Sequence, residues 1–333
     1  MRIVQLNHPS LGRKTAVVEG ETLRLLHTCE STYSCVLTAL IRGASLEETI
    51  ESLAGDETLV YAPVYAGESD WKLLPPLDHP EEPARCFVGG TGLTHSKGAK
   101  NRDAMHAQPA KETLTDSMKI YQWGVEGGKP EAGEIGVQPE WFYKGNGLIL
   151  RAHNEPLEIP NFADDGGEEP EVVGLYVIDM AGTPRRLGFA IGNEFSDHQM
   201  ERKNYLYLAP SKIRNCSVGP ELVLDADFSK IEGTVRIERN GATLWEHPVS
   251  SGEANMTHTL ANLEYHHFKY PLHRRPGDVH LHFFGTGAFS FGAGIELKEG
   301  DRMSVALEGF GKPLVNPLKL DDTPEKWFGA EEI

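Results

Sequence analysis

The sequence predicts a small α+β domain over residues 1–80 and a larger domain, mostly β with some α, over residues 81–333. Two helical patterns lie within the first 55 residues, whereas beyond Cys86 the apolar residues form short runs with a period near two, separated by glycine turns. Between these regions, residues 73–85 place four prolines among thirteen positions, which no helix or central strand tolerates. We therefore expect a linker there.

The composition is that of a globular protein with enough apolar material for a large core. The chain has 333 residues, 39% of them hydrophobic, and its mean hydropathy is -0.37. A net charge of -17 disfavours binding to nucleic acid or to an anionic membrane surface. No run approaches the roughly 20 apolar residues that a spanning helix needs, and the first residues do not resemble a signal peptide. We expect no membrane partner and a cytoplasmic location.

The four cysteines do not form a metal or redox motif. Cys29, Cys35, Cys86 and Cys216 include no CxxC pair. We expect them to be reduced residues that pack in the interior.

The first region reads as two strands followed by two helices. Residues 1–6 and 15–26 have strand composition, and residues 31–43 and 45–55 have helical spacing. In the second helix Ser45 and Glu48 have capping-box spacing, and Gly55 stands where a C-terminal glycine cap is expected.

The second region reads as a series of short strands. The runs are "CFVGG", "GLILRA", "EVVGLYVIDM", "RRLGFAIGN", "GTVRIERNGATLWEH", "DVHLHFF" and "RMSVALEGFG". Asn240 and Gly241 interrupt one alternating run, which is a strong signal for a two-residue β-hairpin turn.

Three glutamates at predicted strand ends are candidate metal ligands. Glu169 and Glu171 flank Pro170 at the start of a strand and share one face, where two like charges repel unless a cation lies between them. Glu194 ends the next strand, Ser196 can cap the helix that follows, and that helix ends near Pro210. Three carboxylates suit Mg²⁺, and Mn²⁺ accepts the same oxygen ligands. Taken alone, "DDGGEEPE" also fits a solvated acidic loop.

Five short segments between residues 86 and 318 resemble motifs of the fumarylacetoacetate hydrolase superfamily, and they occur in the same order as in that family. "EPE" at 169–171 matches that family's E-x-E strand, and "NEFS" at 193–196 matches its N-D-x-S segment. Lys212 precedes a "GP" pair as the family's lysine does, and "PEWFYK" matches P-x-x-F-x-K and gives Lys144. The "FFGTG" stretch matches the turn that faces the family's site and gives Gly285 and Thr286. The resemblance implies a mixed β-roll and β-sandwich catalytic domain, and a homodimer.

Two departures bear on the activity that the resemblance implies. The third ligand is Glu194 where the family has aspartate, and neither His95 nor His106 is followed by a glutamate three residues later, as in the hydrolases' water-activating pair. The "THSKGAKNRDAMH" stretch and the extra N-terminal region resemble a sub-branch of dehydratases that act on 2-keto-3-deoxy-pentonates. A hydrolase activity should therefore not be assumed.

The resemblance implies roles for individual residues. A metal held by the three glutamates would polarise the keto group of a 2-keto-3-deoxy sugar acid, and loss of water would give α-ketoglutarate semialdehyde. Lys212 is the candidate base or electrostatic partner, and His95 on the lid is the candidate acid. Lys144, Thr286, Gly285 and Ser196 are the candidate substrate-binding residues.

Other interpretations remain open from the sequence. The chain can be a hydrolase of acylpyruvate-like diketo acids, or a sugar-acid binding module without activity. Lys212 can be a surface lysine that complements a helix dipole, and His95 can belong to a solvated basic loop. The glycines lack the G-x-G-x-x-G spacing of dinucleotide sites. His280 and His282 share a strand face, but no third nitrogen or sulfur ligand is near in sequence, so we expect packed or interface histidines rather than zinc ligands.

Overall fold

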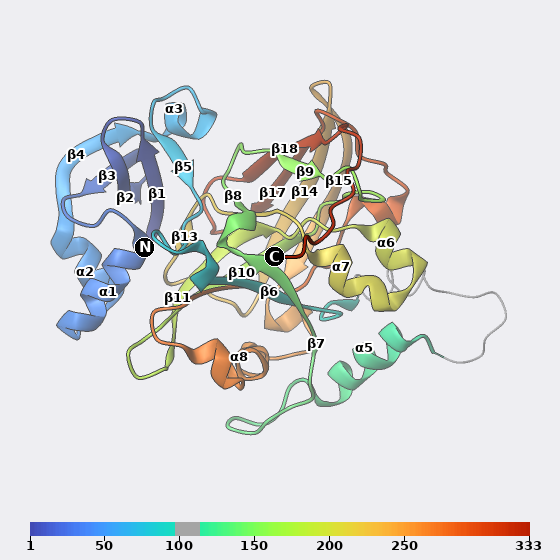
Figure 1. Ribbon diagram of the computed structural model, residues 1–333. Coiled ribbons are helices and arrows are strands. Elements are labelled where there is room, and N and C mark those ends of the chain that lie inside the picture. Colours follow the sequence, from blue (N-terminus) through green and yellow to red (C-terminus); the bar gives the residue numbers. More distant parts are fainter. Residues whose placement is uncertain (97–113) are drawn as a thin grey trace.

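A computed structural model describes residues 1–96 and 114–333 of the chain (Figure 1). Its described part is mostly β, with helices at the periphery, which confirms the predicted fold class. Two sheets carry the architecture, one of 13 strands and one of five. No described helix is long and apolar enough to cross a membrane.

The large sheet has the order β4-β3-β2-β1-β13-β11-β10-β16-β6-β7, with β5, β8 and β12 attached beside this path. Its strands are β1 (Arg2–His8), β2 (Gly12–Glu19), β3 (Thr22–Leu26), β4 (Ala54–Val60), β5 (Lys72–Leu74), β6 (Cys86–Gly92), β7 (Glu140–Asn146), β8 (Leu150–Arg151), β10 (Pro170–Ile178), β11 (Pro184–Asn193), β12 (Cys216–Val218), β13 (Leu222–Val223) and β16 (Val279–Phe283).

The small sheet has the order β15-β14-β17-β18-β9. Its strands are β9 (Leu157–Ile159), β14 (Ile231–Arg239), β15 (Ala242–Ser251), β17 (Arg302–Leu307) and β18 (Leu314–Leu320). The described helices are α1 (Thr32–Arg42), α2 (Leu46–Leu53), α3 (Tyr61–Ala66), α5 (Asp116–Gly127), α6 (His198–Lys203), α7 (Leu208–Lys212) and α8 (Leu260–Phe268). Asn240 and Gly241 both have positive φ between β14 and β15, which confirms the predicted hairpin.

The N-terminal elements differ from expectation in three details. Residues 15–26 form two strands, because Gly20 turns the chain at a φ of 59°. The capping box of Ser45 and Glu48 is present, but α2 ends at Leu53, the capping residue Ala54 is extended, and Gly55 already lies in β4. A Cβ on Gly55 would lie 3.0 Å from the Leu25 carbonyl oxygen, so close strand packing explains this glycine. The expected linker at 73–85 begins inside β5, which pairs with β1.

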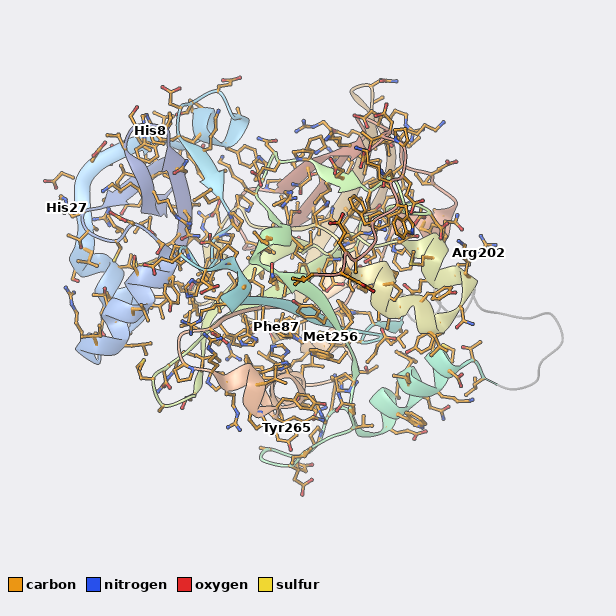
Figure 2. All side chains as sticks on the ribbon, in the orientation of Figure 1. His8, His27, Phe87, Arg202, Met256 and Tyr265 are labelled. Carbon is orange, nitrogen blue, oxygen red and sulfur yellow. The ribbon has the colours of Figure 1, made fainter. Side chains whose placement is uncertain are left out.

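The large sheet runs across the predicted domain boundary near residue 80. β1 pairs with β13, with Ile3 opposite Leu222. One buried cluster contains apolar residues from both sides of that boundary, and it includes the four cysteines, which are buried and unpaired as expected. Figure 2 shows side chains filling the space around both sheets. The division at residue 80 stays a prediction.

The register of β10 and β11 places the acidic segments together. Pro170 pairs with Asn193 across these antiparallel strands, so the start of one strand meets the end of the other. The Glu194 amide donates to the Glu169 carbonyl oxygen at 2.9 Å. The Glu169–Glu171 segment and Glu194 therefore lie side by side where β10 starts and β11 ends.

Candidate active site

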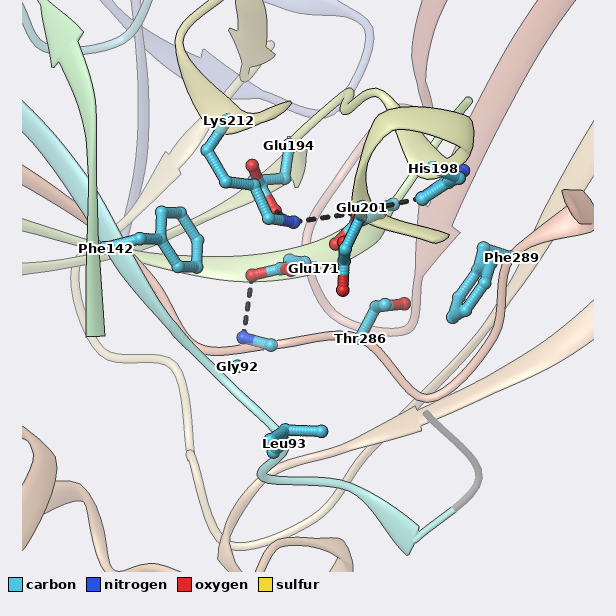
Figure 3. Close-up of a pocket in the computed structure, with 12 residues that line it drawn as sticks. Gly92, Leu93, Phe142, Glu171, Glu194, His198, Glu201, Lys212, Thr286 and Phe289 are labelled. Atoms are coloured by element: carbon cyan, nitrogen blue, oxygen red, sulfur yellow. Dashed lines mark hydrogen bonds and ion pairs between the residues drawn. The ribbon is translucent and has the colours of Figure 1, made fainter. Parts of the chain in front are cut away.

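Three buried glutamates converge at this meeting of strand ends (Figure 3). Glu169, Glu171 and Glu194 each offer a carboxylate oxygen, and these oxygens lie within 4.8 Å of one another. All three side chains are buried, and all three line one pocket. Among the described residues, no other group of histidine, cysteine, aspartate or glutamate ligand atoms converges in this way.

The charges at this cluster favour a cation. Burial raises the pKa of Glu171 well above its ordinary value, and the charges of Glu194 and Glu169 raise it further. Burial also opposes ionisation of Glu169, but Lys212 and His198 outweigh it and hold that pKa well below its ordinary value. Lys212 and the Gly285 amide compensate only part of the cost of charging Glu171. Three hard oxygen donors with surplus negative charge fit Mg²⁺ or Mn²⁺, so the cluster is able to bind such a metal.

Lys212, at the end of α7, binds two of the three glutamates. Its Nζ donates to Glu169 Oε1 at 2.8 Å, to Glu194 Oε2 at 2.6 Å and to Ser196 Oγ at 3.0 Å. The ammonium group also lies 4.9 Å from the centre of the Phe142 ring. The surface-lysine interpretation is therefore wrong, because the Lys212 side chain is buried in the pocket wall.

Two expected substrate-binding residues lie behind the pocket wall. Lys144 is fully buried, and its Nζ donates to Glu194 Oε1 at 2.9 Å, to the Phe195 carbonyl at 2.8 Å and to the Lys212 carbonyl at 2.9 Å. These bonds use all three ammonium hydrogens, so this geometry leaves none for a substrate. Ser196 is also fully buried, and its hydroxyl donates to Glu194 Oε1 at 3.0 Å. Both residues orient Glu194 and Lys212.

Gly285 and Thr286 face the pocket from the loop that follows β16. The Gly285 amide donates to Glu171 Oε2 at 2.7 Å. Gly285 has a φ of 95°, and a Cβ there would lie 2.3 Å from Thr94 Oγ1, so only glycine fits. The loop therefore approaches the carboxylates closely, and substrate binding by these two residues stays a prediction.

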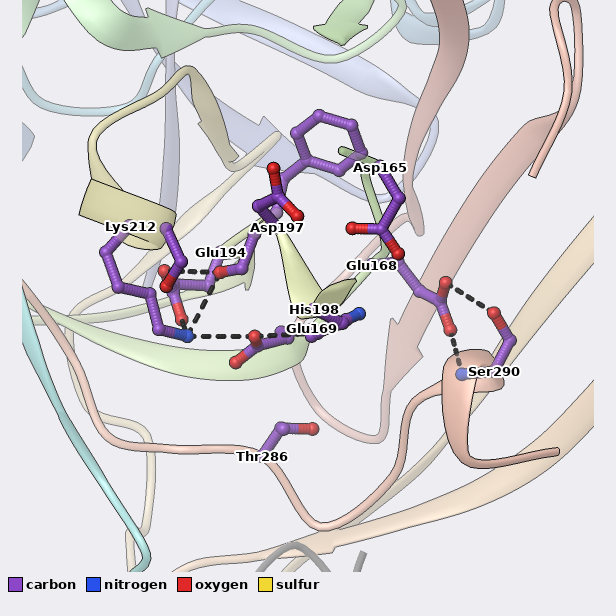
Figure 4. A network of polar contacts seen from close by, with 12 residues as sticks. Asp165, Glu168, Glu169, Glu194, Asp197, His198, Lys212, Thr286 and Ser290 are labelled. Carbon is purple, nitrogen blue, oxygen red and sulfur yellow. Dashed lines mark hydrogen bonds and ion pairs between the residues drawn. The ribbon is translucent and has the colours of Figure 1, made fainter. Parts of the chain in front are cut away.

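A fourth glutamate, which the sequence analysis missed, holds the same loop (Figure 4). Glu168 is fully buried, and its carboxylate accepts the Ser290 amide at 2.6 Å and the Ser290 hydroxyl at 2.8 Å. Burial raises the pKa of Glu168, although the Ser290 bonds oppose that rise. Glu171 in β10 and Glu168 just before β10 together hold the Thr286 loop at two points.

Removal of the Ser290 hydroxyl should loosen this loop. We expect Ser290→Ala to lower the free energy of unfolding by about 1–3 kcal/mol, because a buried carboxylate loses one of its bonds. Urea denaturation measures this change. Ser229→Ala is the matched control, since Ser229 also donates to a carboxylate, Asp227, but at an exposed turn. If Ser290→Ala and Ser229→Ala lower the free energy of unfolding equally, the Ser290 hydroxyl does not hold the loop through the buried Glu168.

The structure does not bring His95 into this pocket. His95 is buried, its Nδ1 lies 2.9 Å from Thr94 Oγ1 and its Nε2 lies 3.2 Å from Ser251 Oγ. Burial lowers its pKa to about 4, so the ring is neutral at pH 7. It lines a separate cavity with Ser250 and Asn255. His95 thus belongs neither to a solvated basic loop nor, in this geometry, to the acidic pocket, and His106 lies outside the described residues.

Two pocket residues on α6 were missed. Asp197, not Ser196, caps this helix, because its Oδ1 accepts the Met200 amide at 2.8 Å. His198 and Glu201 are three positions apart, so both face the pocket. His198 Nε2 lies 2.9 Å from Glu169 Oε1, and its ring stacks on Phe289. The spacing of His198 and Glu201 was visible in the sequence. The helix expected there extended to near Pro210, whereas α6 ends at Lys203, so the sequence did not show that these two side chains face the pocket.

Comparison with known proteins gives two curated relatives that are named dehydratases, whereas the similar solved structures include both a dehydratase and isomerases. No protein-family model matches the chain. The Haloferax volcanii "Probable 2-keto-3-deoxyxylonate dehydratase" is 27% identical over 179 residues, 52% of this chain and 58% of that protein. The Saccharolobus solfataricus "2-dehydro-3-deoxy-D-arabinonate dehydratase" is 24% identical over 258 residues, 75% of this chain and 76% of that protein.

A solved structure has the same fold. It is a 2-keto-3-deoxy-D-arabinonate dehydratase complexed with magnesium and 2,5-dioxopentanoate. The match has a TM-score of 0.71 at 18% identity and covers 97% of this chain and 100% of that one. The predicted resemblance is confirmed: the chain is similar in sequence to proteins named 2-keto-3-deoxy-pentonate dehydratases and has the fold of a solved 2-keto-3-deoxy-D-arabinonate dehydratase.

Proposed function

We propose that this protein is a metal-dependent hydro-lyase that converts a 2-keto-3-deoxy-pentonate into α-ketoglutarate semialdehyde, which is 2,5-dioxopentanoate. The observation that carries the proposal is the buried cluster of Glu169, Glu171 and Glu194 with Lys212 in the same pocket. The names of the relatives support the substrate class.

The reaction needs one proton removed and one hydroxyl released. A divalent cation at the three glutamates would supply Lewis acidity at the keto oxygen of the substrate. Lys212 lies in the pocket wall, where its ammonium charge would stabilise the negative charge that follows loss of the C3 proton. To act as the base itself, Lys212 would first have to give up one of the three hydrogens that it donates to Glu169, Glu194 and Ser196. The C3 proton and the C4 hydroxyl leave as water, a proton then moves from C5 to C3, and the resulting enol becomes the aldehyde.

The remaining wall orients the substrate and limits the access of water. Phe142, Leu93 and Phe289 supply its apolar surface. Thr286 also lines the wall, and its hydroxyl donates to the Ala288 carbonyl oxygen at 2.8 Å. Lys144 holds Glu194 and the Lys212 backbone in place. The metal ligands and the proposed base are thus fixed by residues that themselves do not contact the substrate.

An assay with two substrate classes tests the proposal. Purified protein with Mg²⁺ is incubated with D- and L-2-keto-3-deoxy-pentonates and, in parallel, with acylpyruvates, and products are followed by mass spectrometry. We expect a loss of one water from one configuration of the pentonate, and a chelator should abolish it. Pyruvate release from acylpyruvates without dehydration would replace the proposal by a hydrolase.

The hydrolase has one structural observation in its favour. His198 and Glu201 have the three-residue spacing of the hydrolases' water-activating pair and line the pocket, although they lie on α6 and not on a lid. Against it, His198 already binds Glu169. If both substrate classes bind without turnover, the sugar-acid binding module replaces both activities.

The assembly and the location are proposed on other grounds. The family resemblance favours a homodimer, and two-fold assemblies are the commonest among soluble proteins. A cytoplasmic location fits a metabolic enzyme of this class. Light scattering at micromolar concentration tests the dimer, with twice the 36.8 kDa chain mass as the expected result.

A further inference from the structure

His198, the first residue of α6, is held in place by close packing. It is only 1% exposed, and its ring contacts two aromatic rings, with centre-to-centre distances of 4.9 Å to Phe289 and 5.1 Å to Phe291. A Cβ on Gly167 would lie 2.4 Å from His198 Nδ1, so the backbone of this glycine closes a further side of the ring. The side chain therefore has little freedom to turn.

The polar contacts of His198 are directed at one metal-ligand candidate. Nε2 lies 2.9 Å from Glu169 Oε1, whereas Nδ1 makes no hydrogen bond with a residue that the structure describes. A carboxylate that binds a cation accepts hydrogen bonds and does not donate them, so Nε2 carries the hydrogen. Packing alone does not explain a histidine here, because an apolar side chain fills the same space without burying an unpaired nitrogen.

The Glu169 carboxylate is held from two sides (Figure 4). Lys212 Nζ donates to Oε1 at 2.8 Å, and His198 reaches the same oxygen from the opposite side. A buried ion pair joins the two segments that carry these donors, because Arg214, just after α7, donates to Asp197 Oδ2 at 3.0 Å. Asp197 is the N-cap of α6 and directly precedes His198. Both donors are therefore fixed relative to Glu169.

We propose that His198 is a positioning residue for the metal ion: its hydrogen bond holds the Glu169 carboxylate in the orientation that binds the cation. This inference rests on the proposed function for the metal at the three glutamates. Without His198, Oε1 keeps only the bond from Lys212, and the carboxylate can turn about that bond. His198 thus acts as a hydrogen-bond donor to a ligand and not as the base of a water-activating pair.

Mn²⁺ binding to chelator-treated protein, with free ion followed by electron paramagnetic resonance, measures this role without substrate. We expect His198→Leu, which removes the donor, to weaken Mn²⁺ binding by about 10- to 100-fold. His198→Gln should stay within about threefold of the wild-type affinity, because its amide nitrogen can take the place of the ring Nε2. His198→Asn carries the same amide on a shorter side chain and should bind as weakly as the leucine variant. His247→Leu is the control, since His247 also stacks on an aromatic ring, Trp245, but lies on β15 and does not line the pocket.

Three results would overturn the inference, and none of them depends on turnover. The first is an unchanged Mn²⁺ affinity in a His198→Leu variant that circular dichroism shows to be folded. The second is equal affinity of the glutamine and asparagine variants, a comparison that remains if the leucine variant does not fold. The third, wild-type protein that binds no Mn²⁺, overturns the proposed metal site as well. If Mn²⁺ binding depends on His198 but no dehydration is observed, this inference stands and the proposed reaction fails.

Discussion

Replacement of Glu171 by alanine is expected to abolish turnover while the fold remains intact. Loss of this ligand should weaken metal binding and remove Lewis acidity of several kcal/mol, so we expect kcat/KM to fall by at least about 1,000-fold. The fold should tolerate the change, because burial and two neighbouring carboxylates already disfavour the charged Glu171. Glu171→Gln, which keeps the size of the side chain, should behave in the same way.

Steady-state kinetics and thermal unfolding measure the two halves of this prediction. Glu246→Gln is the control for the loss of one negative charge, since Glu246 pairs with Arg236 at an exposed site. The control should keep full activity. Normal turnover by the Glu171 variants would show that the metal cluster is assigned wrongly, whereas inactive but unfolded variants would show that Glu171 has a structural role.

Acidification from pH 7 to pH 5 is expected to destabilise the protein strongly. Burial lowers the pKa of His280 and His282 to about 3, and that of His153 and His258 to about 4. In the unfolded chain a histidine takes up its proton near pH 6.5. The stability that these neutral rings contribute is therefore full above pH 6.5 and is lost as the pH falls toward 4.

The structure explains why these rings stay neutral. His267 Nε2 lies 3.0 Å from His280 Nδ1, and His267 Nδ1 lies 3.1 Å from His282 Nδ1, beside the Phe87 ring that Figure 2 labels. No third nitrogen ligand lies near His280 and His282 in the sequence, but the fold brings His267 into contact with both rings. The three rings bind one another and do not converge on one point, so the expectation of packed histidines holds.

Urea denaturation at pH 7 and at pH 5 measures the effect. Each histidine with a pKa of 4 or below should cost about 2 kcal/mol at pH 5, so several together approach the whole stability of a typical domain. His282→Gln should reduce the pH dependence, since one proton-binding group is removed. A free energy of unfolding that is equal at pH 7 and pH 5 would contradict the neutral state of the buried rings.

The elements that the sequence analysis predicted correctly depend on local signals. The Asn240–Gly241 hairpin and the Ser45 capping box follow from the residues that these conformations require. The glutamate cluster followed from two strand ends in the order that the family resemblance gives, and the register of Pro170 with Asn193 brings these ends together.

The residues that were misplaced or missed from the sequence have positions that depend on tertiary packing. Lys144 matched a motif, but three oxygen atoms from distant segments use its hydrogens. His95 lies near the loop of Gly285, but its ring points to Thr94 and Ser251. Glu168 stands next to two predicted ligands, and only the loop that carries Ser290 shows its purpose. No local pattern specifies contacts that join segments 50 to 156 residues apart in the sequence.

The most direct test is a titration of chelator-treated protein with Mn²⁺, with free ion followed by electron paramagnetic resonance. We expect one ion bound per chain in the wild-type protein, competition by Mg²⁺, and loss of that binding in the Glu171→Gln and Glu194→Gln variants. Wild-type protein that binds no ion, or variants that still bind one ion with unchanged affinity, would contradict a metal site formed by these three glutamates.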